Sequence, residues 1–353
     1  MATLGSTATT YLDWGRRIDP DGKIARIIDI LSQTNEILDT MLTLESNEAT
    51  GHVSTQRTGL PQATWRLFNQ GVQPTKSTTA QVKDTCGMLE TQSQIDVALA
   101  KLNGNTAEFR LSEDVAFLEG MNQQMAAAIF YSNSLLTPQQ ILGLAPRYAT
   151  VTTLNAQTAN NVIDCGGTGS TNTSIYLLVW GPNYIHGIFP KATKAGLDMI
   201  DLSEGRPDGI PVFNPDGSRM LAYLTHFKWL NGLCVRDWRY GARAANIDVT
   251  QLANPVAVNL LNVLIKLVHK LPTTPIGVAN VQKTDAPGGD DVSMGQTFFY
   301  VNRTLATYLD IQAVNGARVF LKEDEWHGKA ITTFRKVPIM TVDQIVNTEA
   351  RVI

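Results

Sequence analysis

Three features of this chain could carry out chemistry: its five histidines, its three cysteines and one glycine-rich turn. Histidines bind metals or transfer protons, but none here has an HExxH or CxxC…HxxxH spacing. The glycine-rich turn, residues 165–170, lacks the Lys-Ser/Thr pair of a phosphate-binding loop and the third glycine of a dinucleotide-binding turn. We therefore interpret this turn as a hairpin tip. The five histidines are His52, His186, His226, His269 and His327.

A short acidic run, Glu323 to His327, could support acid–base catalysis, but a solvated loop between two strands explains it equally well. No Gly-x-Ser-x-Gly elbow is present. The cysteines, Cys86, Cys165 and Cys234, are odd in number and form no CxxC pair, which favours reduced thiols over disulfides. We therefore expect no enzyme, no catalytic residue, no cofactor and no metal ligand. A metal site assembled by tertiary contact is left open as a minor alternative.

The composition indicates a soluble protein that turns much of its surface toward other protein. Apolar residues make up 43% of the 353 residues, and charged residues only 17%, against about 25% in typical domains. The net charge is −3 and the pI about 6.0, so no basic footprint indicates nucleic-acid binding. The most apolar stretch, 256–268, is interrupted by two Asn and one Lys. It is shorter than the ~20 residues of a membrane helix, and no membrane partner is expected.

The first element that the pattern predicts is a helix that begins after Asp19, which can cap it. It would be either a core helix or a helix that docks on a neighbouring subunit, at about even odds. Residues 1–18 carry little pattern beyond Tyr11, Leu12 and Trp14, and would form an arm. The helix is predicted from one apolar stripe: Ile24, Ile27, Ile28, Leu31, Leu38 and Leu42.

A polar ribbon, Ala49 to Leu89, follows and contains a single acidic residue, Asp84. Its threonine-rich runs at 53–58 and 77–82 favour extended structure. Between them lies the cluster Trp65-Arg66-Leu67-Phe68, which an isolated two-stranded hairpin could not bury. The ribbon is therefore either an edge hairpin packed on its own domain or a long arm that reaches another copy of the chain.

The remaining elements define an α+β chain without repeats. A short helix is expected at 94–102, and a long helix of roughly 40 Å at 105–131. Strands and turns dominate residues 151–248, including the dense strand at 174–180. A helix is expected from Asn254 to about Lys270. The strands at 298–301, 318–321 and 337–340 then surround a helix at 304–314.

Several segments, taken in order along the chain, carry a resemblance to a known family. They are Arg16–Lys23, Gln56–Pro61, Trp65–Leu67, Gly71–Pro74, Leu102–Asn105, Phe109–Glu113, Gly143–Tyr148, Gly187–Lys191, Trp229–Leu233 and Phe334–Glu349. In this order they resemble the coat proteins of short-tailed phages similar to epsilon-fifteen. The resemblance covers nearly the whole length, and the order of the pieces makes it more specific than any single piece.

The resemblance implies a phage capsid fold of the Hong Kong 97 type. It would make residues 1–48 an N-terminal arm with an amphipathic helix, and 49–90 an extended hairpin loop. Residues 91–248 would form a peripheral domain with its spine helix at 105–131, and 249–353 an axial domain. The strand pair around Ile175–Pro190 precedes Phe298–Arg303, whereas the archetype of the fold has the opposite order. The resemblance is therefore to a permuted variant.

The resemblance also implies a major capsid protein of a tailed double-stranded DNA phage, assembled in the host cytoplasm and located in the virion. Its partners would be other copies in hexamers and pentamers, a portal protein, scaffolding and cement proteins, and DNA enclosed without sequence-specific binding. An encapsulin-like nanocompartment shell is the alternative, and a monomeric enzyme the third reading. Interfaces are enriched in aromatics and arginine, so the expected intersubunit residues are Trp14, Arg57, Trp65, Arg66, Phe68 and Lys76.

Overall fold

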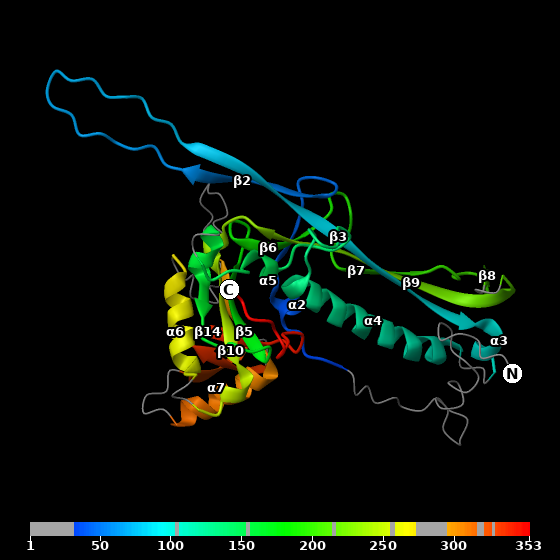
Figure 1. The fold of residues 1–353 in the computed structure, drawn as a ribbon. Helices are drawn as coiled ribbons and strands as arrows, with labels where there is room; N and C mark the ends of the chain where they lie inside the picture. Colours follow the sequence, from blue (N-terminus) through cyan, green and yellow to red (C-terminus); the bar gives the residue numbers. More distant parts are fainter. Residues whose placement is uncertain are drawn as a thin grey trace. The chain divides into compact units, whose positions relative to one another are not determined.

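The computed structural model describes residues 32–102, 106–152, 156–213, 217–254, 258–272, 295–315, 321–326 and 329–353. These residues form two compact units, each built from separate stretches of the chain. Unit 1 contains 32–34, Met88–Ala126 and Gly196–Leu230. Unit 2 contains Asn35–Gly87, Ala127–Ala195 and Asn231–Ile353 (Figure 1).

The core of unit 2 is a mixed sheet centred on strand β5, Asn172–Trp180, in which all nine residues are buried. Burial of consecutive residues is typical of a strand that is covered on both faces. β5 pairs antiparallel with β10, Gly241–Asp248, on one side and with β11, Gln296–Val301, on the other. β14, Val337–Thr341, continues the sheet parallel to β11. β4, Val162–Asp164, pairs parallel with β10. Beyond β14, the sheet continues with a hairpin of β13, Lys329–Phe334, and β12, Leu321–Trp326.

Two helices of unit 2, α6 at Leu260–Lys270 and α7 at Arg303–Asn315, pack their apolar faces into the core of this sheet. α6 is capped by the Asn259 side chain, which accepts a hydrogen bond of 3.0 Å from the Asn262 amide. The Gln312 side chain accepts from the Leu260 amide at 2.9 Å, which joins the two helices. Short helical turns lie at α2 Ile37–Thr40, α5 Leu144–Arg147, η1 Gln157–Asn161, η2 Trp238–Tyr240 and η3 Val249–Gln251.

The end of the chain is fastened to unit 2 by a buried ion pair. Arg243 of β10 donates to Glu349 at 2.9 Å, and both side chains are about 95% buried. Glu349 also accepts hydrogen bonds from the Tyr131 hydroxyl, at 2.6 Å, and from Ser174. Charged groups can be buried in this way only because each of them has an ion-pair or hydrogen-bond partner.

Unit 1 holds most of the long helix α4, Thr106–Tyr131, and a smaller sheet. β9, Arg219–Val235, pairs antiparallel there with β7, Leu197–Asp201, and β8, Ile210–Phe213. The short helix α3, Val97–Ala100, is capped by Asp96, whose carboxylate accepts from the Ala98 amide at 2.7 Å. A small apolar cluster completes the unit: Ile95, Val97, Leu99, Ala100, Phe109 and Tyr223.

Several predictions of secondary structure are confirmed and others are wrong. The long helix, the strand at 174–180 and the two strands of the polar ribbon are confirmed. The helix expected from Gln94 begins only at Val97, because strand β3, Thr78–Asp96, continues to the capping aspartate. The helix expected from Asn254 begins at Leu260. The acidic run was predicted as a loop, but Glu323 to Trp326 belong to β12, a strand at the sheet edge, where charged residues are common.

Of the helix expected after Asp19, residues up to 31 lie outside the part of the chain that the structure describes. The described remainder is the single helical turn α2, followed by β1, Thr43–Glu45. β1 pairs parallel with β6, Ile185–Phe189. No helix among the described residues is long and apolar enough to cross a lipid bilayer.

Candidate functional site

The most unusual feature of unit 2 is a hairpin, which we call the arm and define as residues 51–83. It consists of β2, Gly51–Gly59, the first part of β3, and the connecting segment 60–77. The two strands pair antiparallel from Gly51 opposite Thr85 to Gly59 opposite Thr78. Figure 1 shows the arm projecting from the sheet of its own unit, with the connecting segment at its far end.

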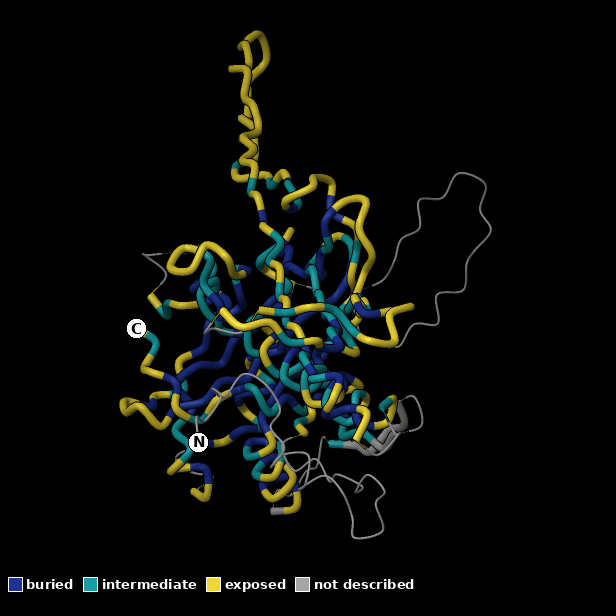
Figure 2. Tube along the Cα trace, turned by 90° about the vertical axis from the view of Figure 1, so that its right-hand side faces the viewer, coloured by how far each residue is buried: buried dark blue, intermediate teal, exposed yellow. Residues whose placement is uncertain are grey.

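The far end of the arm exposes large apolar side chains. Trp65 is fully exposed, Phe68 is 95% exposed and Leu67 71%. Internal support is slight: Arg66 Nη1 donates to the Gln70 carbonyl at 3.0 Å, and the Thr75 hydroxyl donates to the Gln62 carbonyl at 3.2 Å. Figure 2 shows this distal part exposed along its length. Clustered apolar exposure of this kind marks a surface that another protein covers.

The root of the arm is fixed to unit 2. Asp84, which is almost completely buried, accepts from Arg147 at 2.7 Å and from the Val235 amide at 3.1 Å. Arg147 also donates to the Leu233 carbonyl at 3.0 Å. On β2, the Gln56 side chain donates to the Arg236 carbonyl at 2.9 Å. The arm is therefore anchored to the rest of unit 2 at its root, whereas residues 60–77 are exposed.

The arm brings together five of the six residues predicted for an intersubunit surface. Arg57, Trp65, Arg66, Phe68 and Lys76 are all exposed on it. The sixth, Trp14, lies outside the described residues. The arm contains no acidic residue, so its own charged side chains are all positive.

A second cluster, which the sequence spacing did not reveal, lies at the root of the arm. It consists of His52 on β2, His186 on β6 and Cys234 on β9, whose side-chain nitrogen and sulfur atoms all lie within 4.8 Å of one another. The two imidazole rings meet edge to face, with centroids 5.5 Å apart. His186 and Cys234 are direct partners in the β6–β9 ladder, and His52 is opposite Asp84 in the β2–β3 ladder.

Burial controls protonation in this cluster. Desolvation, aided by His52 and Arg236, lowers the pKa of His186 to about 4. Burial and Arg236 also lower the pKa of His52. Burial and the neighbouring Asp84 raise the pKa of the Cys234 thiol to about 12. Near neutral pH the cluster is therefore two neutral imidazoles and a thiol.

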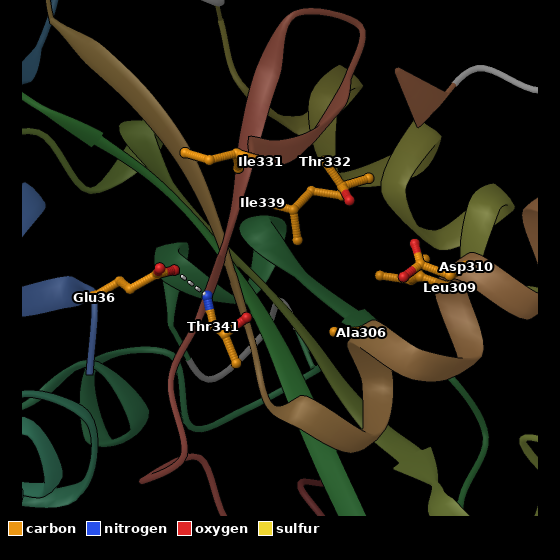
Figure 3. A pocket seen from close by; sticks show the side chains of 8 residues that line it. All are labelled: Glu36, Ala306, Leu309, Asp310, Ile331, Thr332, Ile339 and Thr341. Atoms are coloured by element: carbon orange, nitrogen blue, oxygen red, sulfur yellow. Dashed lines mark hydrogen bonds between the residues drawn. The ribbon is translucent and has the colours of Figure 1, made fainter. Parts of the chain in front are cut away.

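Unit 2 also contains a cavity of about 220 Å³, where β13, β14 and α7 meet (Figure 3). One of its two carboxylates, Glu36, already accepts from the Thr341 amide at 2.7 Å. The volume is below the roughly 300–1,000 Å³ of small-molecule sites, and we assign no ligand to it. The lining residues are Glu36, Ala306, Leu309, Asp310, Ile331, Thr332, Ile339 and Thr341.

Comparison with known proteins assigns the chain to a family. The family model for "Major capsid protein GP7" matches residues 19–353. A chain in the cryo-EM structure of bacteriophage epsilon15 is 33% identical, with a TM-score of 0.73, over 100% of this chain and 99% of that one. No curated protein sequence matches.

Looser structural matches follow. The capsid of bacteriophage JBD30 is 12% identical, with a TM-score of 0.43, over 90% of this chain and 93% of that one. The holo-SrpI encapsulin complex of Synechococcus elongatus PCC 7942 is 11% identical, with a TM-score of 0.43, over 65% and 93% of the two chains. A TM-score of 0.43 is too low to support a conclusion about function. The encapsulin-like alternative therefore has the weaker support.

The mixed helix and sheet architecture described above is thus the phage capsid fold seen in the epsilon15 particle. The match over almost the entire chain places this protein in the capsid of a virion as a structural subunit. The chain belongs to the major capsid protein GP7 family, and it is a major capsid protein of a tailed bacteriophage.

Proposed function

We propose that copies of this chain assemble through their arms into the hexamers and pentamers of an icosahedral shell, with each arm lying on a neighbouring subunit. The observation that carries the proposal is the exposure of Trp65 and Phe68 at the end of an arm whose root is anchored. Large aromatic side chains are the usual anchors of protein interfaces. In the free subunit nothing among the described residues of the same unit buries them, so a second copy would supply the cover.

Charge complementarity supports the choice of a second copy as the surface under the arm. The arm carries four basic residues and no acidic one, which leaves −7 on the remainder of a chain whose net charge is −3. Opposite charges steer association and fix register more than they add affinity. The four residues are Arg57, Arg66, Lys76 and Lys83.

The wider assignment follows from this assembly role. Residues 1–48, including Trp14, would form an N-terminal arm, 91–248 a peripheral domain and 249–353 an axial domain. The shell would form in the host cytoplasm, enclose double-stranded DNA without reading its sequence, and associate with a portal protein and with scaffolding and cement proteins. The subunit would act without catalysis or cofactor. It would function only through its interfaces with other proteins of the shell.

The test is to replace both exposed aromatics, Trp65→Ser with Phe68→Ser, and to examine purified protein by negative-stain microscopy. Side chains this exposed contribute little to folding, so the free energy of unfolding of the subunit should change by less than about 0.5 kcal/mol. Closed shells should nevertheless be lost.

A matched control is the pair Leu135→Ser and Leu136→Ser. These leucines are 84% and 80% exposed in the turn after α4 and do not belong to the arm. The control should assemble like the wild type. Normal shells from the aromatic double variant would contradict the proposed role of the arm.

A further inference from the structure

We propose that His52, His186 and Cys234 form a binding site for one transition-metal ion of the zinc class at the root of the arm. This site is independent of the proposed assembly role, because all its ligands come from one unit of one chain. Two imidazole nitrogens and one sulfur are a donor set that favours Zn²⁺ over Mg²⁺ or Ca²⁺, which prefer oxygen.

The spacing of the donor atoms is close to what an ion would require. Bond lengths of about 2.0–2.3 Å in a tetrahedral zinc site place neighbouring donor atoms about 3.4 Å apart. The three donors here already lie within 4.8 Å of one another before any ion draws them in. His52 is only partly buried, so its ring can make the remaining adjustment. His186 and Cys234 need little movement, since they are paired across one ladder.

A second observation points to a ligand: nitrogen atoms in this cluster are buried without a hydrogen-bond partner. They are both ring nitrogens of His52 and Nδ1 of His186. His186 is 1% exposed, and buried polar groups normally have partners. An ion bound to these nitrogens would supply the missing partner.

Two charged side chains near the cluster, Asp84 and Arg236, would affect a bound cation in opposite ways. The carboxylate of Asp84 lies near Cys234 and is held in place by Arg147 and the Val235 amide. Its negative charge would attract the ion without its being a ligand itself. Arg236 is the opposing group, but its guanidinium is directed to the Pro182 carbonyl at 3.0 Å. On binding, the thiol would release one proton to solvent and the thiolate would bind the ion.

The fourth coordination position would be taken by water, because the described residues supply three ligands. An ion held in this way links β2 to β6 and β9. It would therefore fix the root of the arm to the sheet, next to the Asp84–Arg147 ion pair.

The test uses the full-length chain after treatment with a chelator, titrated with Co²⁺ as a spectroscopic probe and then with Zn²⁺. The wild type should bind one Co²⁺ per chain with a thiolate-to-metal charge-transfer absorption, and Zn²⁺ should remove that absorption. Cys234→Ser should abolish the band. His52→Gln should weaken binding at least about tenfold.

Cys165→Ser and His269→Gln are the matched controls, because neither residue belongs to the cluster. Both should bind Co²⁺ like the wild type. The absence of a thiolate band in the wild type, or its persistence in Cys234→Ser, would overturn the proposal. If Cys234→Ser does not fold, His52→Gln decides, since His52 is the least buried residue of the three: an unchanged affinity overturns the site. None of these outcomes depends on whether shells form.

Discussion

At the scale of single residues, the buried charges of unit 2 are informative because each is held by a partner within the unit. Asp84 pairs with Arg147 at the root of the arm, and Glu349 pairs with Arg243 beneath the end of the chain. A buried pair adds little net stability, but the loss of one partner leaves a buried charge uncompensated. These pairs therefore determine where segments that are distant in sequence must lie.

Replacement of Glu349 by Ala should reduce the free energy of unfolding of the free subunit by about 3–5 kcal/mol. The substitution strands the Arg243 guanidinium, which is 4% exposed, and removes the acceptor of the Tyr131 and Ser174 hydroxyls. Equilibrium denaturant unfolding measures the change.

The control is Glu48→Ala, which breaks the exposed ion pair of Glu48 with Lys83, whose side chains are 45% and 46% exposed. Exposed pairs contribute about 0–1 kcal/mol, so this variant should unfold almost like the wild type. Equal losses in the two variants would show that burial of the Glu349 pair is unimportant.

The exposed residues of the arm could be predicted from the sequence, but the His52–His186–Cys234 cluster at its root could not. Trp65 and Phe68 are recognisable because they interrupt a polar, acid-poor segment. His52, His186 and Cys234 have no local spacing to reveal them, since each lies on a different strand. Only the strand register, a tertiary property, brings them together.

At the scale of elements, local patterns predicted α4, β5 and the two arm strands, because each carries its own signal of periodicity or composition. What could not be predicted is pairing. β5 lies between β10 and β11, two strands that are separated by 47 residues of the chain, 249–295. The length of β3 was also missed. Its extension to Asp96 depends on its neighbours β2 and β9 in the sheet and not on its own polar sequence.

The arm should show a gradient of amide hydrogen exchange in free subunits. Residues 60–77 have no ladder partner, and the one backbone hydrogen bond among them is from Gln70 to Leu67, so they should exchange fastest. The β2–β3 ladder should exchange more slowly. Assembled shells should protect the whole arm, because a neighbouring subunit would then cover it.

Buried strand β5 serves as the internal reference, and should be protected in both free and assembled protein. Mass spectrometry of peptides from the two preparations gives the comparison. Strong protection of residues 53–82 in free subunits would argue that the arm is already covered before assembly.

At the scale of the whole molecule, charge distinguishes a shell that condenses on nucleic acid from one that forms by itself. Proteins that bind DNA through its backbone use clusters of Lys and Arg and gain free energy from counterion release. This chain has a net charge of −3, and the charged residues of the arm, which we assign to contacts between subunits, are all basic. The subunits therefore have little electrostatic reason to assemble around DNA.

It follows that purified subunits, freed of nucleic acid by nuclease, should close into shells as efficiently as subunits supplied with double-stranded DNA. Microscopy and sedimentation of the two preparations at matched protein and salt concentrations make the comparison. The charge-reversed variant Arg66→Glu should assemble poorly in both, since it alters the arm and not a DNA contact, whereas Lys194→Glu, an exposed change outside the arm, should assemble in both. Shells that closed only with DNA present would mean that the arm's positive charge serves nucleic acid, and the role of a neighbouring subunit as its acidic partner would have to be abandoned.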